Sequence, residues 1–154
     1  MLIRKATIRD VPEMQKLINL SAERGELLPR SLNQLYEEIR DFFLVEEAGR
    51  IVGTCALHVN WGDLAEVKSL VVDEGFQSKG LGKQLVQTCL DEARSLGVSR
   101  VFALTYKPDF FHRLGFRSID KSELPQKVWT ECIHCVKFPD CGEVAVICDV
   151  RGET

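Results

Sequence analysis

The segment "VKSLVVDEGFQSKGLGKQLV", residues 67–86, constrains the fold more than any other part of the chain. Its first residues are rich in β-branched and apolar types, which predicts a strand, and Leu81 and Leu85 begin an apolar stripe at helical spacing. Gly80 and Gly82 stand at the join. A strand that bends through glycine into a helix is typical of mixed α/β and α+β domains, and the helix start can bind an anion.

Two known phosphate-binding motifs fail on this bend. A nucleotide-triphosphate P-loop counted from Gly75 to Gly80 requires a lysine next, and the chain has Leu81. A dinucleotide fingerprint begun at Gly80 and Gly82 requires a third small residue where Leu85 stands. The sequence therefore does not predict either of these nucleotide sites.

The physical case for an anion at this bend does not depend on those motifs. A helix start has about four backbone N–H groups without partners and about half a positive charge. Gly80 and Gly82 lack side chains that would keep a pyrophosphate from this backbone, and Lys79 and Lys83 add charge beside it. The alternative is an ordinary strand-to-helix turn with solvated lysines.

The rest of the chain predicts a mixed α/β or α+β domain. Two amino-terminal helices should begin at Asp10, with Glu13 completing a capping box, and at Ser31, with Gln34 in the same role. The other expected elements are a hairpin around Gly49, a strand over 65–73, a helix after the bend that stops at Gly97, a strand over 99–106, a short helix over 109–116 and a strand over 143–150.

Composition limits the class of protein. At 154 residues the chain predicts one domain, residues 1–154, able to bury about two thirds of its unfolded surface. A net charge of -3 gives no reason to expect nucleic acid. No apolar run reaches membrane-spanning length and no secretory signal is evident, so we expect a cytoplasmic protein that does not bind membranes.

The order of these features resembles the GNAT superfamily of N-acetyltransferases. The loop "Q-x-x-G-x-G" after "SLVVDEGF" is similar to the acyl-CoA pyrophosphate loop of that family, and "IRKATIRD", "IVGTCAL" and "FFHRLGF" follow the family's order over about residues 2–120. The resemblance implies the GNAT fold, a mixed and mostly antiparallel sheet flanked by helices. It also implies acetyl-CoA as co-substrate, bound by the strand, the loop and the helix start: Leu70, Val71, Val72, Gln77, Ser78, Lys79, Gly80, Leu81, Gly82 and Lys83.

A narrower resemblance concerns the acetyl acceptor. "GELLPRS", the acidic-apolar helix after it, and "ELPQKVW" look like the acetyltransferase domain of N-acetylglutamate synthases. This implies the α-amino group of glutamate as acceptor and a role in arginine biosynthesis. The chain is too short for the amino-acid-kinase domain of longer synthases, so we expect a stand-alone short form without arginine feedback through such a domain.

Acetyl transfer to an amine requires a neutral amine, a polarised carbonyl and a proton for the departing thiolate. Glu66, at the head of the central strand where several GNAT relatives have a glutamate, is the candidate base. The resemblance assigns carbonyl polarisation to a backbone N–H among Leu70, Val71 and Val72, with Val72 preferred. The alternatives are a solvated strand-end carboxylate and a merely buried strand.

No general acid is assigned. Many relatives have a tyrosine where this chain has Phe111, which carries no proton to donate. Tyr106 and His112 are the nearest substitutes, and unassisted departure of the thiolate is also plausible because its pKa is modest, about 8.5. Phe110, Phe111, Leu114 and Phe116 are expected to pack the short helix and line the pantetheine slot.

An acidic acceptor requires cations. Arg30 can form a bidentate pair with a carboxylate, and Lys68 on the central strand can bind the second. The alternative for each is a solvated charge.

A cysteine cluster, "CIHCVKFPDC", contains Cys132, Cys135 and Cys141, with His134 between them and Cys148 nearby. Reduced free thiols, a structural metal site with three thiolates and redox control all fit this spacing, and we commit to no metal.

Three functions therefore remain open. The first is an acetyl-CoA-dependent N-acetyltransferase for glutamate, and the second is an N-acetyltransferase for another small amine or a protein N-terminus. The third is a CoA-binding regulatory module without catalysis, for which Phe111 is the argument. The last strand, 143–150, would allow pairing across chains in a homodimer if it lies at a sheet edge.

Overall fold

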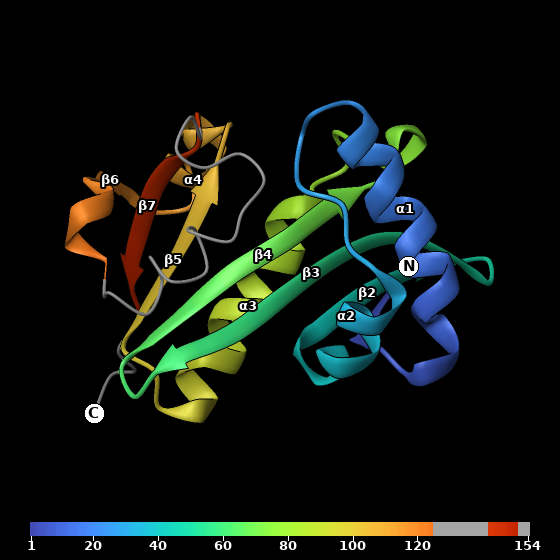
Figure 1. Cartoon of the computed structure of the whole chain (residues 1–154), viewed down its shortest axis with the longest axis horizontal. Coiled ribbons are helices and arrows are strands. Elements are labelled where there is room, and N and C mark those ends of the chain that lie inside the picture. Colours follow the sequence, from blue (N-terminus) through green and yellow to red (C-terminus); the bar gives the residue numbers. More distant parts are fainter. Residues whose placement is uncertain (125–141, 151–154) are drawn as a thin grey trace. The chain divides into compact units, whose positions relative to one another are not determined.

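The computed structural model of the chain describes residues 1–124 and 142–150, which fall into two compact units. The first contains Met1–His58 and Val67–Glu92, and the second contains Val59–Glu66 and the described chain from Ala93 onward. Two long strands, β3 (Arg50–Trp61) and β4 (Leu64–Val72), contribute to both units (Figure 1).

In the first unit the strands are ordered β1-β2-β3-β4. β1 (Leu2–Lys5) pairs antiparallel with β2 (Phe42–Glu47), and β2 pairs antiparallel with β3. The turn between β2 and β3 has two left-handed residues, Ala48 (φ 50°) and Gly49 (φ 78°), the backbone that two-residue hairpins favour. The predicted hairpin around Gly49 is confirmed.

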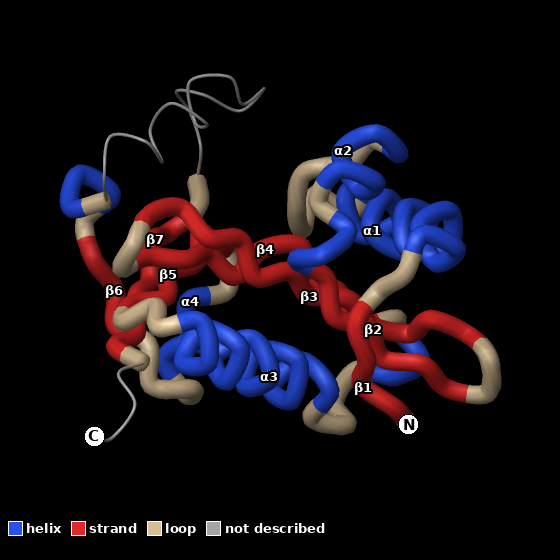
Figure 2. Tube along the Cα trace, turned by 90° about the horizontal axis from the view of Figure 1, so that it is seen from below, coloured by secondary structure: helices blue, strands red, loops and turns tan. Residues whose placement is uncertain are grey.

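Helices cover both faces of the strands of this unit. In Figure 2, α1 (Val11–Glu23) and α2 (Leu32–Glu37) lie on one face, and α3 (Leu81–Leu96) lies on the other. The apolar residues of α1 recur at helical spacing and are buried in one cluster with residues of α2, β2 and β3: Val11, Met14, Leu17, Ile18, Leu35, Phe42, Leu44 and Ile51. Short 3₁₀ turns occupy Ile8–Asp10, Ile39–Asp41, Glu74–Phe76 and, in the second unit, Lys121–Glu123.

The start of α2 has the predicted capping box. The Ser31 hydroxyl accepts a hydrogen bond from the Gln34 N–H at 3.1 Å, and the Gln34 side chain accepts one from the Ser31 N–H at 3.0 Å. Each bond satisfies a donor that a helix start leaves unpaired. The helix itself ends at Glu37, earlier than the apolar pattern indicated.

The predicted Asp10–Glu13 capping box is wrong, because both carboxylates bind elsewhere. Asp10 accepts from the Thr7 N–H at 2.7 Å and caps the 3₁₀ turn that precedes α1. Glu13 accepts from the N–H of Ile51 on β3 at 2.7 Å. Glu13 thus has the spacing of a capping-box residue, but it binds β3 instead. The proximity of β3 cannot be predicted from the local sequence.

In the second unit the order is β4-β5-β7-β6. β5 (Arg100–Thr105) runs parallel to β4, and β7 (Val144–Asp149) pairs antiparallel with both β5 and β6 (Arg117–Ile119). The short helix α4 (Pro108–His112) follows β5. The core of the unit contains Leu64, Phe102, Leu124, Ala145 and Ile147.

The mixed and mostly antiparallel sheet with flanking helices confirms the predicted fold class. Two further details of the sheet bear on the sequence-based expectations. The strand at the carboxyl-terminal end, β7, is paired on both sides and is therefore not an edge strand. The short strands β1 and β6 were not predicted, because three or four residues carry too little periodicity. Among the described residues, no helix combines the length and the apolar character needed to cross a membrane.

Candidate acyl-transfer site

The regular backbone of β4 is interrupted at Ser69. This residue has φ 54°, in the left-handed region that a non-glycine residue rarely adopts inside a strand. Its carbonyl accepts a hydrogen bond from the Thr54 hydroxyl at 2.9 Å, which fixes the irregular backbone to β3. An irregularity of this kind re-aims the backbone groups that follow it, here Leu70, Val71 and Val72.

The loop after β4 is held by its own side chains. Asp73 accepts from the Gly75 N–H at 3.0 Å, and the Gln77 side-chain amide donates to the Val72 carbonyl at 3.0 Å. Gln77, predicted from the sequence to bind the cofactor, therefore connects the loop to the end of the strand. Ser78 (φ 67°) and Gly80 (φ 78°) both adopt the left-handed backbone that turns the chain into α3.

The start of α3 has the features expected of an anion site. Its first intrahelical hydrogen bond joins the Gln84 N–H to the Gly80 carbonyl at 3.1 Å, so the N–H groups of residues 81–83 have no acceptor within the helix. Lys79 and Lys83 are exposed beside it. Lys79 Nζ lies 5.0 Å from the centre of the Phe76 ring, an arrangement that keeps this charge at the loop.

Arg30 is a largely enclosed cation of the candidate site. Its side chain is only 10% exposed, and its Nη1 donates to the Ser69 hydroxyl at 2.9 Å. Its Nη2 is paired with Glu38 Oε2, and the guanidinium carbon lies 5.9 Å from the centre of the Phe42 ring. Asn19 accepts from the Arg30 N–H at 3.0 Å and, like Gln15, donates to its carbonyl. The predicted acceptor ligand is thus fixed at the irregular point of β4.

A second group of ionisable side chains adjoins Arg30. His58 Nδ1 lies 2.7 Å from Asp41 Oδ2 and 3.8 Å from Glu38 Oε1. The hydrogen bond to Asp41 raises the pKa of His58, and partial burial and the charge of Lys68 oppose this effect in part. Glu38, Asp41 and His58 have a metal-ligating composition, with ligand atoms within 4.8 Å of one another. Arg30 already neutralises Glu38, however, which makes the group a poor match for a cation.

The candidate base Glu66 is 7% exposed, near the beginning of β4. It pairs in register with Phe102 of β5, at the last position of the β4–β5 ladder. Lys68, the second candidate cation, is half-buried two residues further along the same strand. Side chains alternate along a strand, so Glu66 and Lys68 belong to the same face of β4.

The residues near the missing tyrosine pack as the sequence predicted. Phe111 is 5% exposed, and its ring makes edge contacts with the rings of Phe110 and Phe116, each at 5.1 Å between centroids. His112 is exposed and its Nε2 lies 2.7 Å from the Ser118 hydroxyl. Tyr106 is 37% exposed. These contacts assign a general acid to none of the three.

The cysteine cluster lies outside the described residues at Cys132, Cys135 and Cys141, as does His134. Among the described residues, Cys55, Cys89 and Cys148 are free thiols. Cys55 and Cys89 are fully buried with sulfur atoms 3.6 Å apart, and their contact and burial raise the pKa of Cys55. Such thiols pack the core and are unreactive.

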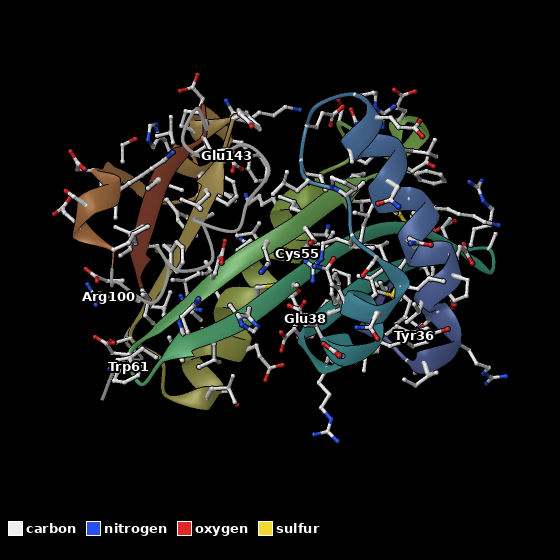
Figure 3. All side chains as sticks on the ribbon, in the orientation of Figure 1. Tyr36, Glu38, Cys55, Trp61, Arg100 and Glu143 are labelled. Carbon is white, nitrogen blue, oxygen red and sulfur yellow. The ribbon has the colours of Figure 1, made fainter. Side chains whose placement is uncertain are left out.

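Three residues of the site were missed by the sequence analysis: Ser69, Glu38 and His58. Nothing in the letters "VKSLVV" signals a left-handed residue, because serine has no special preference for that backbone. Glu38 and His58 come from separate elements, so their proximity depends on tertiary structure. Figure 3 labels Glu38 at the end of α2, beside β3.

Comparison with known proteins gives consistent results. Residues 11–116 match the model of the acetyltransferase (GNAT) family. The "Uncharacterized N-acetyltransferase CT2212" of Chlorobaculum tepidum is 37% identical, and the alignment covers 94% of both chains. The "Amino-acid acetyltransferase" of Mycobacterium tuberculosis is 36% identical over 84% of this chain and 75% of its own.

Solved structures show the same similarity. The N-acetylglutamate synthase of Neisseria gonorrhoeae, in complex with coenzyme A and N-acetyl-glutamate, superposes with a TM-score of 0.87 at 28% identity over 98% of this chain and 35% of the synthase. Rv2747 of Mycobacterium tuberculosis, in a complex that contains CoA, has a TM-score of 0.83 at 31% identity over 97% of this chain and 99% of its own. The chain belongs to the GNAT family of acetyltransferases.

Proposed function

We propose that this chain is an acetyl-CoA-dependent N-acetyltransferase whose acceptor is the α-amino group of glutamate. The observation that carries the proposal is the hydrogen bond from Arg30 to Ser69 at 2.9 Å. It joins a largely enclosed guanidinium to the irregular point of β4, immediately before the three residues assigned to the acyl carbonyl. An acceptor carboxylate bound by Arg30 would have its amine close to the thioester.

The cofactor part of the proposal rests on the helix start. The N–H groups of residues 81–83, which have no acceptor within the helix, together with Lys79 and Lys83, would bind the pyrophosphate of acetyl-CoA. The backbone of Leu70, Val71 and Val72 would bind the acyl and pantetheine part, with the Val72 N–H directed at the carbonyl oxygen. The related structures that contain CoA support acetyl-CoA as the co-substrate.

The chemistry would proceed in one addition and one elimination. Glu66 accepts a proton from the acceptor ammonium, directly or through water, and the neutral amine attacks the thioester carbonyl. The oxygen of the tetrahedral intermediate is stabilised by the Val72 N–H. The C–S bond then breaks and CoA departs as the thiolate, which has a modest pKa and requires no dedicated acid. The second proton of the attacking nitrogen passes to this thiolate or to water, which leaves a neutral amide.

The acceptor class rests on charge. The Arg30 guanidinium is a cation that presents N–H donors in a planar fork, and two of these donors are used by Ser69 and Glu38. The remaining donors, with Lys68, suit the two carboxylates of glutamate. Relatives named amino-acid acetyltransferase and the complex of the gonococcal synthase with N-acetyl-glutamate support this acceptor. Arginine biosynthesis would be the corresponding pathway.

The test is a thiol-release assay with acetyl-CoA and a panel of free amino acids and one peptide. Glutamate should be the best acceptor. The variant Arg30→Lys should lower kcat/KM for glutamate by about tenfold to a hundredfold, because one charge-assisted hydrogen bond is lost. The affinity for acetyl-CoA should not change.

Two results would decide against the proposal. If only the peptide is acetylated, or if Arg30→Lys and Arg30→Ala retain full activity on glutamate, the acceptor is another amine. Absence of turnover with every acceptor, despite binding of acetyl-CoA, would favour a non-catalytic CoA-binding module.

A further inference from the structure

Arg30 and His58 share one counterion, Glu38. The two oxygens of this carboxylate are divided between them: Oε2 is paired with Arg30 Nη2, and Oε1 lies 3.8 Å from His58 Nδ1. Glu38 immediately follows α2 while His58 is on β3, so the carboxylate connects a helix end, the loop of Arg30 and a strand of the first unit. Its side chain is 26% exposed, which leaves limited water to replace either partner.

Arg30 depends on this carboxylate to keep its position. A guanidinium that is 90% covered loses most of its hydration, and a single hydroxyl, that of Ser69, does not compensate for the loss. With Glu38 neutral or absent, the guanidinium gains hydration by moving away from β4. The charge of Glu38 therefore favours the orientation in which Arg30 lies beside the acyl-binding strand.

We propose that Glu38 is a positioning residue that orients Arg30 toward the acceptor, and that a positive charge on His58 strengthens acceptor binding through Glu38. This inference deepens the proposed function and rests on Arg30 as the ligand of the acceptor. Protonated His58 attracts Glu38 and holds it between two cations. It also makes the group of Arg30, Lys68, His58, Glu38 and Asp41 net positive, whereas neutral His58 leaves that group without net charge.

The direction of the pH effect follows from the groups around His58. Asp41 and Glu38 favour the imidazolium, partial burial and Lys68 oppose it, and the net effect raises the pKa of His58 above the usual 6.5. The charge is therefore present at and below pH 6.5 and is lost as pH rises through the higher folded-state value. The KM for an acidic acceptor should rise over the same interval.

The kinetic experiment compares the wild type with His58→Gln on glutamate, with acetyl-CoA saturating, from pH 6 to pH 9. Ionisation of the acceptor cancels when the two enzymes are compared at the same pH. At pH 6 the KM of His58→Gln should exceed that of the wild type by about three- to tenfold, the effect of one charge at this range in a partly solvated site. At pH 9 the two values should coincide.

The positioning role of Glu38 is tested by comparing variants of two adjacent residues. Glu38→Gln keeps the shape and loses the charge, and it should raise the KM for glutamate at least fivefold while kcat stays within twofold and acetyl-CoA affinity is unchanged. Glu37→Gln, one position earlier and exposed, should retain the wild-type KM. A fall in kcat with unchanged KM, or equal effects of both variants, would overturn the positioning role.

A second measurement does not depend on the acceptor. The chain has three histidines, so the imidazole signal of His58 can be assigned by NMR and titrated. Arg30→Met should raise the pKa of His58, because a competing cation is removed from Glu38, and the same change in a Glu38→Gln background should have little effect. Failure to acetylate glutamate would reject the proposed function, while an unchanged His58 titration in Arg30→Met would reject the coupling itself.

Discussion

The ion pair between Arg4 and Asp10 should make stability depend on acid pH in a calculable way. Arg4 donates to both oxygens of Asp10, at 2.8 and 2.9 Å, and Thr7 adds a backbone hydrogen bond. The hydrogen bonds from Arg4 lower the pKa of Asp10 from 3.8 to about 2, although partial burial acts in the opposite direction. The carboxylate is only 12% exposed, so solvent screening is limited.

The magnitude follows from linkage. A pKa that is lowered from 3.8 to about 2 corresponds to about 2.4 kcal/mol of stability at neutral pH. Because the folded-state value is the lower one, this stability is complete well above pH 3.8 and is lost as pH falls through 2. About half of it should remain at pH 3.

Urea unfolding at pH 7 and pH 3 tests this estimate on the wild type and Asp10→Asn. The free energy of unfolding of the variant should be lower by about 2 kcal/mol at pH 7 and by about 1 kcal/mol at pH 3. Asp109→Asn is the matched control, since the side chain of Asp109 is 91% exposed. A difference between wild type and variant below about 0.5 kcal/mol at pH 7, which is about a fifth of the linkage value, would refute the reasoning. A difference that does not become smaller at pH 3 would refute it as well.

Three further predictions concern the cofactor, the base and the core. Gly82→Val should abolish acetyl-CoA binding, measured by calorimetry, without loss of stability, because the valine side chain would stand at the helix start. The control Gly62→Val should bind acetyl-CoA normally. If Gly82→Val and the wild type bind acetyl-CoA equally well, the loop is not the cofactor site. Glu66→Gln should lower kcat by about 10²- to 10⁴-fold and recover part of it at higher pH, where free amine is abundant, and a rate within about twofold of wild type would exclude the base role. Gly53→Ala should lower the free energy of unfolding by about 1–3 kcal/mol, because the new Cβ would lie 3.2 Å from a side-chain atom of Leu85 and 3.3 Å from one of Val45. Gly62→Ala, whose new Cβ would have open space around it, is the control. If the melting temperatures of Gly53→Ala and Gly62→Ala are the same, the neighbouring side chains can move to accommodate the added methyl group.

The sequence predicted the fold well where local and tertiary preferences agree. The stripe of α1, the Ser31–Gln34 capping box and the Gly49 hairpin each depend on residues a few positions apart, and all three formed. The Asp10–Glu13 box failed because Arg4 and Ile51 compete for the same carboxylates. Competition of this kind cannot be predicted unless one knows which distant segments lie next to each other in the fold.

The candidate site was predictable only in part. Chemical type and family resemblance nominated Arg30, Glu66 and the loop, and these remain predictions that the proposed experiments test. The left-handed backbone of Ser69 and the sharing of Glu38 between Arg30 and His58 arise from contacts across three elements. No periodicity or spacing encodes them.

The anchoring of Arg30 has a consequence for transplanting acceptor preference between relatives. Its backbone is fastened to Asn19 of α1, and its guanidinium to Glu38 and Ser69. A graft of the loop alone would bring the arginine without its supports, and the charge would face solvent. Substitutions at Arg30, Glu38 and Ser69 should therefore be strongly non-additive, and exchange of acceptor preference should succeed only when the three residues are moved as a set.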